Sequence, residues 1–525
     1  MTNSTLNNLR KQLTFDFTLN FNVELDPQEV ALMTLFENLD YSAFGKDLGR
    51  HEKISADKMM ILLVHGAVNN KTSTRDLERL VNRDLFMKAV FGPEVKVDHS
   101  TISRFIKKYP KEIEDVFYQS VKQLDKLGEL GKKVVFQDGT KIESRANKYS
   151  FVWKSYTEKN KEKCLNRMKG IIMEAEEQNI ITLAKTAETE QEIHAAVSSI
   201  IQAVEEKGLF DYSAKRGSGH KKNKINDLYL RSKTEIEKLN TCNYYLSNMN
   251  GRNSLAKTDI DATFMHMKED YMRNGQLKPG YNIQNAVDSN YVVASSISSD
   301  RTDYNTVPHI LKKLHNYDFK YEVLCADSGY DSLTSYHALE QEGIEAYIKP
   351  QDWEISKTRK YQNDIGRSIN MTYVEEGNYF ICANNKKLEF TNTYKHYGAG
   401  VYACTRGCVT CPFRESCIRN PRKNKFKKIE VQLEHQKYQK LAYEKLTTDF
   451  GCEVRTNRSI QVEGRFAEIK QQLGLRRFSS SGKTRVFTEW IIACMASNVV
   501  QLAARIEQEK VGKPFWYRIE KEKIA

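Results

Sequence analysis

The sequence lacks any run that approaches the roughly 18 consecutive apolar residues of a membrane-spanning helix. Its first residues lack the basic segment followed by an apolar stretch that marks a secretory signal peptide. Proline is scarce, with 9 residues, and 40% of the chain is hydrophobic, which is a globular composition. We therefore expect a cytoplasmic protein without a membrane segment.

At 525 residues the chain is too long for one compact core, and about two to four domains are expected. The net charge of +13 favours a polyanionic partner, because Lys and Arg contacts to phosphates supply most sequence-independent affinity for nucleic acids. The alternative is a basic but ordinary cytosolic enzyme. In that compartment the 10 cysteines are read as thiols or metal ligands rather than disulfides.

Three carboxylates stand far apart in the sequence. Asp138 ends the apolar run 134–137, Asp327 ends the apolar run 323–326, and Glu463 lies in a helical stretch. A single Asp after a strand is usually a turn former or a helix cap. Together, however, three oxygen ligands of this kind suit two hard cations such as Mg²⁺, which clamp the attacking and leaving oxygens of a phosphodiester. In a basic protein they indicate the cutting and joining of DNA.

Other acidic residues compete for these roles. Asp259 and Asp261 form an Asp-x-Asp pair that also suits hard metals, although a turn or substrate-positioning role is the alternative. Asp331 is most simply a helix cap. Glu468 is the rival of Glu463 for the third carboxylate. We prefer Glu463 because Lys470, seven residues later, shares its helical face and suits a phosphate lying over the metals.

The order of predicted elements is that of an RNase H-like sheet. A strand with Asp138 is followed by a hairpin over 280–297, a helix over 305–314, a strand before Asp327 and a helix with Glu463. We therefore predict an α/β RNase H-like core, a mixed sheet flanked by helices. The chain is predicted to divide into an all-α N-terminal domain that binds DNA (1–130) and a catalytic domain in two parts (131–349 and 451–510). A helical insertion (about 155–250) and an irregular, Cys-rich, basic insertion (350–450) interrupt the catalytic domain. The stretch 484–507 is predicted to be a buried amphipathic helix.

The N-terminal block contains a helix entry at Asp98, a capping side chain before an amphipathic run. Ser100, Thr101 and Arg104 lie near the start of this helix and could meet a phosphate or a base edge, as in a helix-turn-helix. A plain helical packing domain is the alternative.

Four clustered cysteines, Cys404, Cys408, Cys411 and Cys417, predict a structural Zn²⁺ site, because Cys-x₂-Cys with further Cys nearby is typical of tetrahedral zinc. Cys382 is a fifth candidate, so the ligand set is open, and coincidental thiols are the alternative. The basic residues that follow the cluster could present charge to DNA. Arg476 and Arg477, after Glu463, could hold a DNA backbone or form a solvated face.

Several motifs resemble the DDE-type insertion-sequence transposases of bacteria, and the resemblance covers most of the chain. The motifs occur in the family's order: Asp98 to Phe105 in the N-terminal block, Asp138-Gly139-Thr140-Lys141-Ile142, Asp259-Ile260-Asp261-Ala262 with residues 280–284, Asp327-Ser328-Gly329-Tyr330-Asp331, and Val462-Glu463-Gly464-Arg465-Phe466 with Lys470. Many relatives place Tyr and Arg seven and four residues before the Glu. Here those positions are Thr456 and Ser459, and Arg458, one residue out of register, is the candidate for the phosphate-contacting role.

The resemblance implies that Asp138, Asp327 and Glu463 hold two Mg²⁺ or Mn²⁺ ions. It implies cleavage of element ends and transfer of their 3′-hydroxyls into target DNA, with double-stranded terminal inverted repeats and target DNA as partners. Lys470, Arg458 and Arg465 are expected to contact DNA. A homodimer is expected in the synaptic complex, since two ends must meet, in the bacterial cytoplasm at the nucleoid. The alternatives are an RNase H-like nuclease without strand transfer and a catalytically inactive DNA-binding relative.

Overall fold

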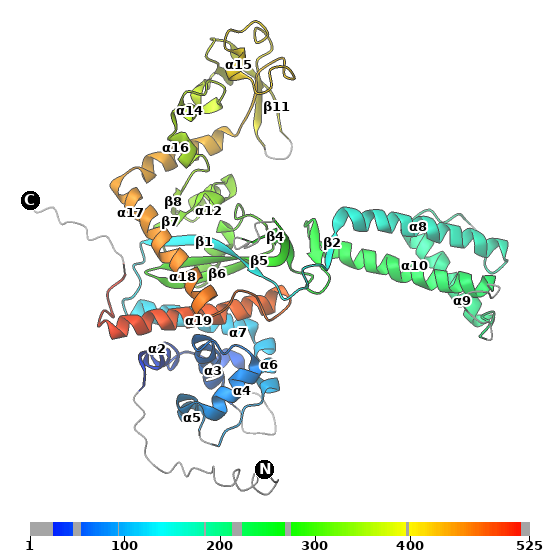
Figure 1. The fold of residues 1–525 in the computed structure, drawn as a ribbon, viewed down its shortest axis with the longest axis horizontal. Coiled ribbons are helices and arrows are strands. Elements are labelled where there is room, and N and C mark those ends of the chain that lie inside the picture. The colour runs from blue at the N-terminus through cyan, green and yellow to red at the C-terminus, as the bar shows by residue number, and fades with distance from the viewer. Residues whose placement is uncertain are drawn as a thin grey trace, which may run out of the picture.

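A six-stranded mixed sheet forms the centre of the molecule (Figure 1). The computed structural model describes residues 25–45, 54–92, 94–182, 185–212, 223–267, 275–394 and 398–515. The sheet has the order β4-β5-β1-β7-β8, and β6 pairs with β5. Its strands are β1 (Val134–Glu143), β4 (Thr263–His266), β5 (Leu277–Asp288), β6 (Tyr291–Ser298), β7 (Val323–Ala326) and β8 (Glu345–Ile348).

Strands β1 and β7 are parallel neighbours, from Val134 opposite Val323 to Gln137 opposite Ala326. Strand β1 continues to Glu143 and pairs there with β5, so Asp138 lies in mid-strand and not at a strand end as predicted. The β1–β7 ladder ends at the pair Gln137 and Ala326, whereas β1 itself continues. Asp138 follows Gln137 and Asp327 follows Ala326, so the two aspartates lie next to each other on adjacent strands.

The predicted hairpin is confirmed. Strands β5 and β6 pair antiparallel from Asn282 opposite Ser298 to Asp288 opposite Tyr291. Ser289 and Asn290 form the two-residue turn, with φ of 52° and 67°. Positive φ at both central residues gives a turn whose twist matches that of the strands, which favours a tight hairpin.

Helix α19 (Lys483–Glu507) lies across the sheet and confirms the prediction of a buried helix. By length and composition it is apolar enough to cross a membrane, but 72% of its most apolar window is buried inside the protein. It packs on β6 and on the N-terminal helices α2 (Pro27–Phe36), α3 (Ala56–Val68) and α7 (Pro110–Lys126). Core burial therefore accounts for its apolar character, and the N-terminal helices share one hydrophobic core with the sheet.

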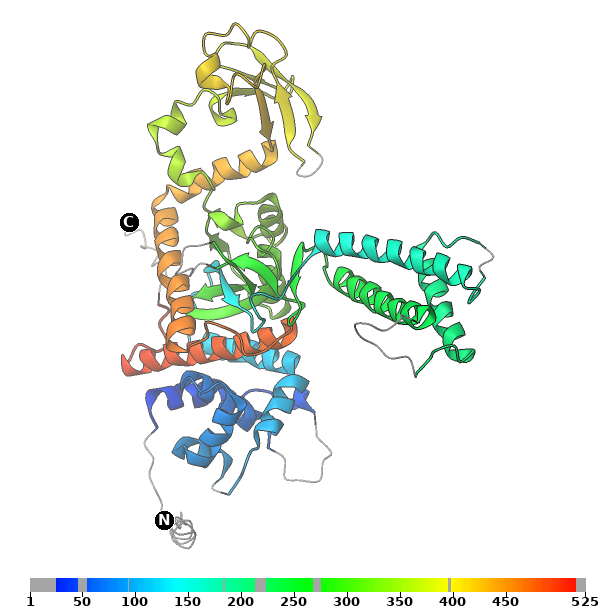
Figure 2. The same cartoon turned by 45° about the vertical axis from the view of Figure 1, so that its right-hand side comes forward.

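The remaining N-terminal elements are helical, as predicted. They are η1 (Ser42–Phe44), α4 (Thr74–Arg83), α5 (Leu85–Phe91) and α6 (His99–Lys108). With α2 and α3 they form a block on the side of α19 away from the sheet (Figure 2).

A helical arm projects from the sheet (Figure 2). Its helices are α8 (Lys154–Glu177), α9 (Glu190–Glu206) and α10 (Lys224–Ser247), and they enclose a hydrophobic core of their own. The arm is joined to the body through the paired strands β2 (Phe151–Trp153) and β3 (Ser254–Ala256). The two short strands were not foreseen, because three-residue strands leave little alternation to read.

The Cys-bearing insertion is not irregular, contrary to the prediction. After α13 (Trp353–Ser356), α14 (Arg359–Gln362) and η3 (Ser368–Asn370) it forms a five-stranded antiparallel sheet with its own small core and one further short helix: β9 (Thr372–Val374), β10 (Tyr379–Ile381), β11 (Lys387–Thr393), β12 (Gly400–Ala403), β13 (Lys428–Val431) and α15 (Arg414–Cys417). Its strands are short and largely polar on one face, so the alternation of apolar and polar residues was too weak to predict them.

A run of helices returns the chain from the insertion to the central sheet. It comprises α16 (Leu433–Leu446), α17 (Asp449–Arg458), the π turn η4 (Ser459–Glu463), α18 (Gly464–Ala467) and the π turn η5 (Glu468–Gln472). The segment from α17 to η5 lies along the sheet, where η4 contacts β1 and β5 (Figure 1). Helices α11 (Val307–Asn316) and α12 (Leu333–Gln341) and the turn η2 (Ser328–Tyr330) complete the surroundings. A mixed sheet flanked by helices in this way fits an RNase H-like α/β core.

Candidate active site and nucleic-acid interface

Asp138 and Asp327 lie side by side where the β1–β7 ladder ends. Each carboxylate accepts a hydrogen bond from a glycine N–H close in sequence: Asp138 Oδ1 from Gly139 at 2.7 Å, and Asp327 Oδ1 from Gly329 at 2.8 Å. These bonds fix one oxygen of each side chain. Asp138 is nearly buried, with 6% of its surface exposed. The two carboxylates are thus held by backbone N–H groups on neighbouring central strands of the sheet.

Arg458 links Asp138 to Glu463. Its Nη1 lies 3.5 Å from Asp138 Oδ2, and its Nη2 lies 3.8 Å from Glu463 Oε1. The π turn between Arg458 and Glu463 explains why the arginine lies five residues before the glutamate and not four. A π turn spaces its contacts by five residues where an α-helix uses four, so Arg458 reaches Glu463 from five residues away. The Arg one position out of register therefore occupies the place beside the carboxylates.

Glu463 and its rival Glu468 have opposite environments. The side chain of Glu463 is 64% exposed on the surface that carries Asp138, while that of Glu468 is 7% exposed. Glu468 forms an ion pair with Arg465 at 2.6 Å. Burial raises the pKa of Glu468, and the charge of Arg465 opposes that rise. Glu468 is therefore an interior residue, and so is Arg465, whose side chain does not reach the surface where DNA contact was expected.

A buried polar network lies behind the Asp pair. Its members Asn282, Gln284 and Tyr330 lie in motifs of the resemblance, whereas Asp303 was not foreseen. Asp303 Oδ1 accepts hydrogen bonds from Asn282 at 2.7 Å and Gln284 at 2.8 Å. Gln284 also bonds the Tyr330 hydroxyl at 2.5 Å. Burial raises the pKa of Tyr330 well above its usual value, and the nearby carboxylates Asp138, Asp303 and Asp327 raise it further. Tyr330 thus stays a neutral donor that ties the Asp327 loop to β5.

The competing aspartates serve the fold. Asp259 is 3% exposed and accepts bonds from Tyr281, Ser144 and the N–H of Gly482, while Asp261 accepts one from the N–H of Lys483 at the start of α19. Both oxygens of Asp259 and one oxygen of Asp261 accept bonds from protein donors.

Asp331 is not the helix cap that was predicted, because Ser332 caps α12. Asp331 is fully buried and accepts bonds from His435 at 2.8 Å and Gln439 at 2.7 Å, both on α16. Burial would raise its pKa, but these bonds lower it overall. The residue fastens the helices that lead to Glu463.

A basic pocket of about 200 Å³ lies between the end of β1 and the start of β5. We call it the β5-side pocket, and its basic lining residues are Lys141, Lys278, Lys470, Arg476 and Arg477. Glu143 balances part of this charge, at 3.2 Å from Lys278. Arg477 also donates to three backbone carbonyls, at residues 144–146, so part of its guanidinium has a structural role. Lys141 and Lys278 were missed because no spacing in the sequence links them to Lys470.

Side chains of α6 gather on its exposed face. Arg104 donates to the Ser100 carbonyl at 3.2 Å and lies 3.3 Å from the Thr101 hydroxyl, so the three residues predicted to contact DNA form one cluster. A groove of about 870 Å³ runs between the N-terminal block and α19. Its basic lining residues are Arg75, Lys107, Arg145, Arg477 and Arg485. Arg477 lines both this groove and the β5-side pocket, so the two are neighbours at this residue.

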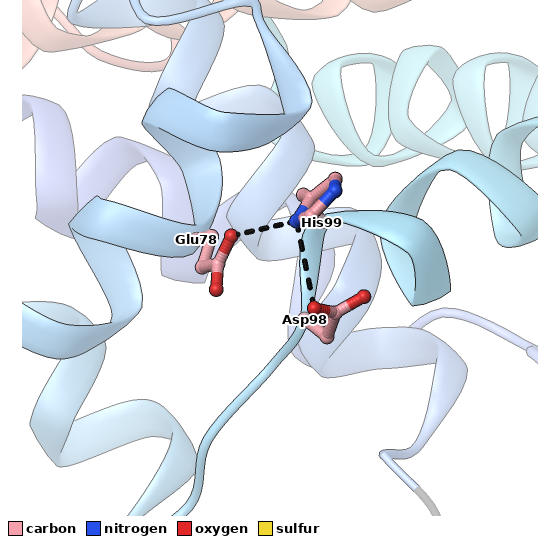
Figure 3. Close-up of side chains that lie close together, drawn as sticks. All are labelled: Glu78, Asp98 and His99. Atoms are coloured by element: carbon pink, nitrogen blue, oxygen red, sulfur yellow. Dashed lines mark hydrogen bonds and ion pairs between the residues drawn. The ribbon is translucent and has the colours of Figure 1, made fainter.

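Helix α6 is held by the cluster in Figure 3. His99 Nδ1 lies 3.0 Å from Glu78 on α4 and 3.5 Å from Asp98, which caps α6 through the N–H of Ser100. Within the described ranges this is the one set of three His, Cys or carboxylate side chains whose ligand atoms lie within 4.8 Å of one another. Neither the three carboxylates nor the cysteines of the insertion reach that spacing. Since the residues are partly exposed and already paired, a clamp between α4 and α6 explains the cluster.

All five cysteines of the insertion line one cavity of about 20 Å³. Burial raises the pKa of Cys404 to about 11, and an adjacent Cys408 adds to that rise. The cavity has room for about one water-sized particle. Thiol sulfur is a ligand that Zn²⁺ prefers, so the chemistry of the donor set suits one zinc ion, although the sulfurs lie farther apart than the ligand atoms of the Glu78, Asp98 and His99 cluster.

Comparison with known proteins supplies two matches. A family model described as a transposase DDE domain matches residues 381–503, and one described as a transposase domain (DUF772) matches residues 25–108. The first match contains the cysteines, Glu463 and Lys470, and Asp138 and Asp327 lie outside it. The second contains α6. No curated protein and no solved structure matches the chain.

Proposed function

Because the chain belongs to the DDE-type insertion-sequence transposases, we propose that Asp138, Asp327 and Glu463 form its catalytic centre. The observation that carries this proposal is the level placement of Asp138 and Asp327, with Arg458 between Asp138 and Glu463. The guanidinium of Arg458 shows that this group of acids accommodates positive charge. Three carboxylates on one surface also provide the oxygen ligands that hard divalent metals prefer. Two Mg²⁺ or Mn²⁺ ions, when bound, would activate the attacking oxygen and neutralise the leaving one.

The residues of the chain supply the rest of the chemistry. Arg458 would orient Asp138 and Glu463, and Lys470 in the β5-side pocket would hold a backbone phosphate of the DNA. Water attack on the phosphodiester at the element end would release a 3′-hydroxyl. Attack of that hydroxyl on a target phosphodiester would then join the element to new DNA and release a target 3′-hydroxyl.

The test uses the purified protein, Mg²⁺ and a duplex with the short inverted repeats that bracket the coding region. We expect cleavage at the repeat ends and, with pre-cleaved 3′-hydroxyl ends, joined products. Cleavage without joining would favour a nuclease instead. Binding without either reaction would favour an inactive DNA-binding relative.

The N-terminal block is proposed to bind the inverted repeat through Ser100, Thr101 and Arg104, as the exposed cluster on α6 supports. Arg104→Ala should weaken DNA binding and reduce the slope of log K against log[salt] by about 1, because one phosphate contact releases about one counterion. Fluorescence anisotropy over a salt series measures this. Arg83→Ala, an exposed arginine at the end of α4, is the charge-matched control. An equal change of slope in both variants would contradict the assignment.

The insertion is proposed to carry one structural Zn²⁺ bound by four of its five cysteines. Cys408→Ser combined with Cys411→Ser should reduce the metal content from about one zinc per chain to almost none, because zinc ties down a domain with a small core. Elemental analysis gives the content, and hydrogen exchange should rise in β9 to β13. Cys452→Ser, outside the insertion sheet, is the control. A wild-type protein that folds this sheet without zinc would contradict the proposal.

A homodimer in the synaptic complex, acting at the bacterial nucleoid in the cytoplasm, completes the proposal, since two element ends must be brought together. Light scattering on the protein with paired inverted-repeat duplexes tests the stoichiometry.

A further inference from the structure

A second basic cavity, of about 490 Å³, opens beside Asp327 at the β8 edge of the sheet. We call it the β8-side pocket, and its basic lining residues are Lys349, Lys357, Arg455 and Arg458. The ends of β7 and β8, the end of α17 and the start of η4 form its walls. Its volume lies within the roughly 300–1,000 Å³ of ordinary ligand sites.

The pocket carries an excess of positive charge. Glu354 is the one carboxylate among its lining residues, and it is shared by Lys349 at 2.7 Å and Lys357 at 3.1 Å. Arg455 has no carboxylate partner within the described residues. Three cations thus face one anion before Arg458 is counted. An anionic ligand would complete this balance.

The setting of Arg455 suits a phosphate. Its guanidinium lies 5.0 Å from the centre of the Trp353 ring, and Tyr443 stacks on that ring at 5.1 Å. A stacked guanidinium keeps the N–H groups on its edge available, and that edge matches phosphate oxygens. Trp353 itself is 4% exposed, so it offers no free face to a nucleobase. The pocket therefore favours backbone phosphate over a stacked base.

The two basic pockets lie on opposite sides of the Asp pair. The strand order puts the β5-side pocket beyond β1 on one side and the β8-side pocket beyond β7 on the other. The helical segment from α17 to η5 carries cations of both, with Arg455 and Arg458 near its start and Lys470 near its end, and Glu463 lies between them (Figure 1). A straight α-helix would rise about 22 Å from Arg455 to Lys470, and the two π turns shorten this somewhat, to about six nucleotides along one DNA strand.

The end of the transposable element is expected to reach Asp138 and Asp327 from the side of the β5-side pocket. The β5-side pocket shares Arg477 with the groove that borders α6, the helix on which the inverted repeat is proposed to bind. The DNA beyond the scissile phosphate must leave on the other side. We infer that the β8-side pocket binds backbone phosphates of the flanking DNA, about two to four nucleotides beyond the scissile phosphate. This inference rests on the proposed function and adds the path of the DNA that the enzyme cuts away.

The test compares two duplexes with the same inverted repeat, one with about ten flanking nucleotides and one with a single flanking nucleotide. Wild type, the double variant Lys357→Ala with Arg455→Ala, and the control Arg359→Ala with Lys360→Ala are assayed for single-turnover cleavage and for salt-dependent binding. The control residues are exposed on α14 and do not line the pocket.

We expect the double variant to cut the long-flank duplex about 10- to 100-fold more slowly than wild type, because charge-assisted bonds to phosphate are lost. On the single-nucleotide flank the two proteins should bind alike. The slope of log K against log[salt] should be steeper by about 2 on the long flank for wild type and for the control, but not for the double variant.

A double variant that cuts and binds the long-flank duplex like the control would overturn the inference while leaving the proposed function intact. An equal loss of binding on both duplexes would also overturn it, because the defect would then not depend on the flank. If wild type cuts neither duplex with Mg²⁺ or Mn²⁺, the proposed function itself fails, and this inference fails with it.

Discussion

Asp138→Asn and Asp327→Asn should each slow DNA cleavage by roughly 10³-fold or more, because the loss of a metal-binding oxygen removes several kcal/mol of transition-state stabilisation. Binding of the inverted repeat should change by no more than about twofold, since the proposed DNA contacts lie on α6 and in the β5-side pocket. Asparagine keeps the size of the side chain and one carbonyl oxygen, so the bonds from Gly139 and Gly329 can persist. Single-turnover cleavage and anisotropy on the same duplex separate the two quantities.

Asp318→Asn is the matched control for these variants. Asp318 is exposed, it lies outside the site, and its φ of 61° is one that asparagine tolerates well. Cleavage at the wild-type rate by either Asp138→Asn or Asp327→Asn would remove that residue from the catalytic centre. Loss of cleavage in Asp318→Asn would point to a general effect of lost negative charge.

Glu463→Gln and Glu468→Gln should separate catalysis from folding within one helical segment. Glu463→Gln should slow cleavage by about 10²- to 10³-fold and leave the free energy of unfolding almost unchanged, because the side chain is exposed. Glu468→Gln should lower the free energy of unfolding by about 3 kcal/mol or more, because Arg465 would remain buried with its charge uncompensated. Its cleavage rate in the folded protein should stay within a few-fold of wild type. Urea unfolding and single-turnover cleavage are the measurements.

A third variant tests whether the uncompensated charge of Arg465 is what destabilises Glu468→Gln. Arg465→Met combined with Glu468→Gln removes both buried charges and should recover part of the lost stability. If Glu468→Gln abolished cleavage in a fully stable protein while Glu463→Gln cut normally, the choice between the two carboxylates would have to be reversed. DNA affinity should not fall in the Arg465→Met variant, since that side chain lies in the interior.

Strong local patterns in the sequence predicted the core elements well. The apolar runs before Asp138 and Asp327 were β1 and β7, the tight turn at Ser289 and Asn290 gave the β5–β6 hairpin, and the apolar stretch near the C-terminus was the buried helix α19. Each pattern rests on a contiguous run whose burial or turn geometry depends on neighbouring residues. The antiparallel sheet of the insertion was missed because four of its five strands have only three or four residues, too few to show a period of two.

Predictions that depended on helical register or on burial were less successful, because local sequence patterns determine neither. Asp331 follows a 3₁₀ turn and looks like a cap, but contacts with His435 and Gln439, more than 100 residues away, make it a buried anchor. Arg465 was expected to contact DNA because it lies in the motif of Glu463, yet the helix turns it inward onto Glu468. The ideal helical spacing used for Glu463 and Lys470 does not hold across two π turns.

The sequence by itself determined the types of residue, their order and the strands and helices that carry them, because these depend on contiguous runs of side chains. It therefore determined the family and the short list of acids. Only the tertiary structure decided which acids lie level on adjacent strands, which arginine lies between them, and which glutamate faces the surface. Those outcomes depend on strand register, π turns and burial among segments hundreds of residues apart. The same long-range packing creates two basic pockets on either side of the acids, which no spacing in the sequence reveals.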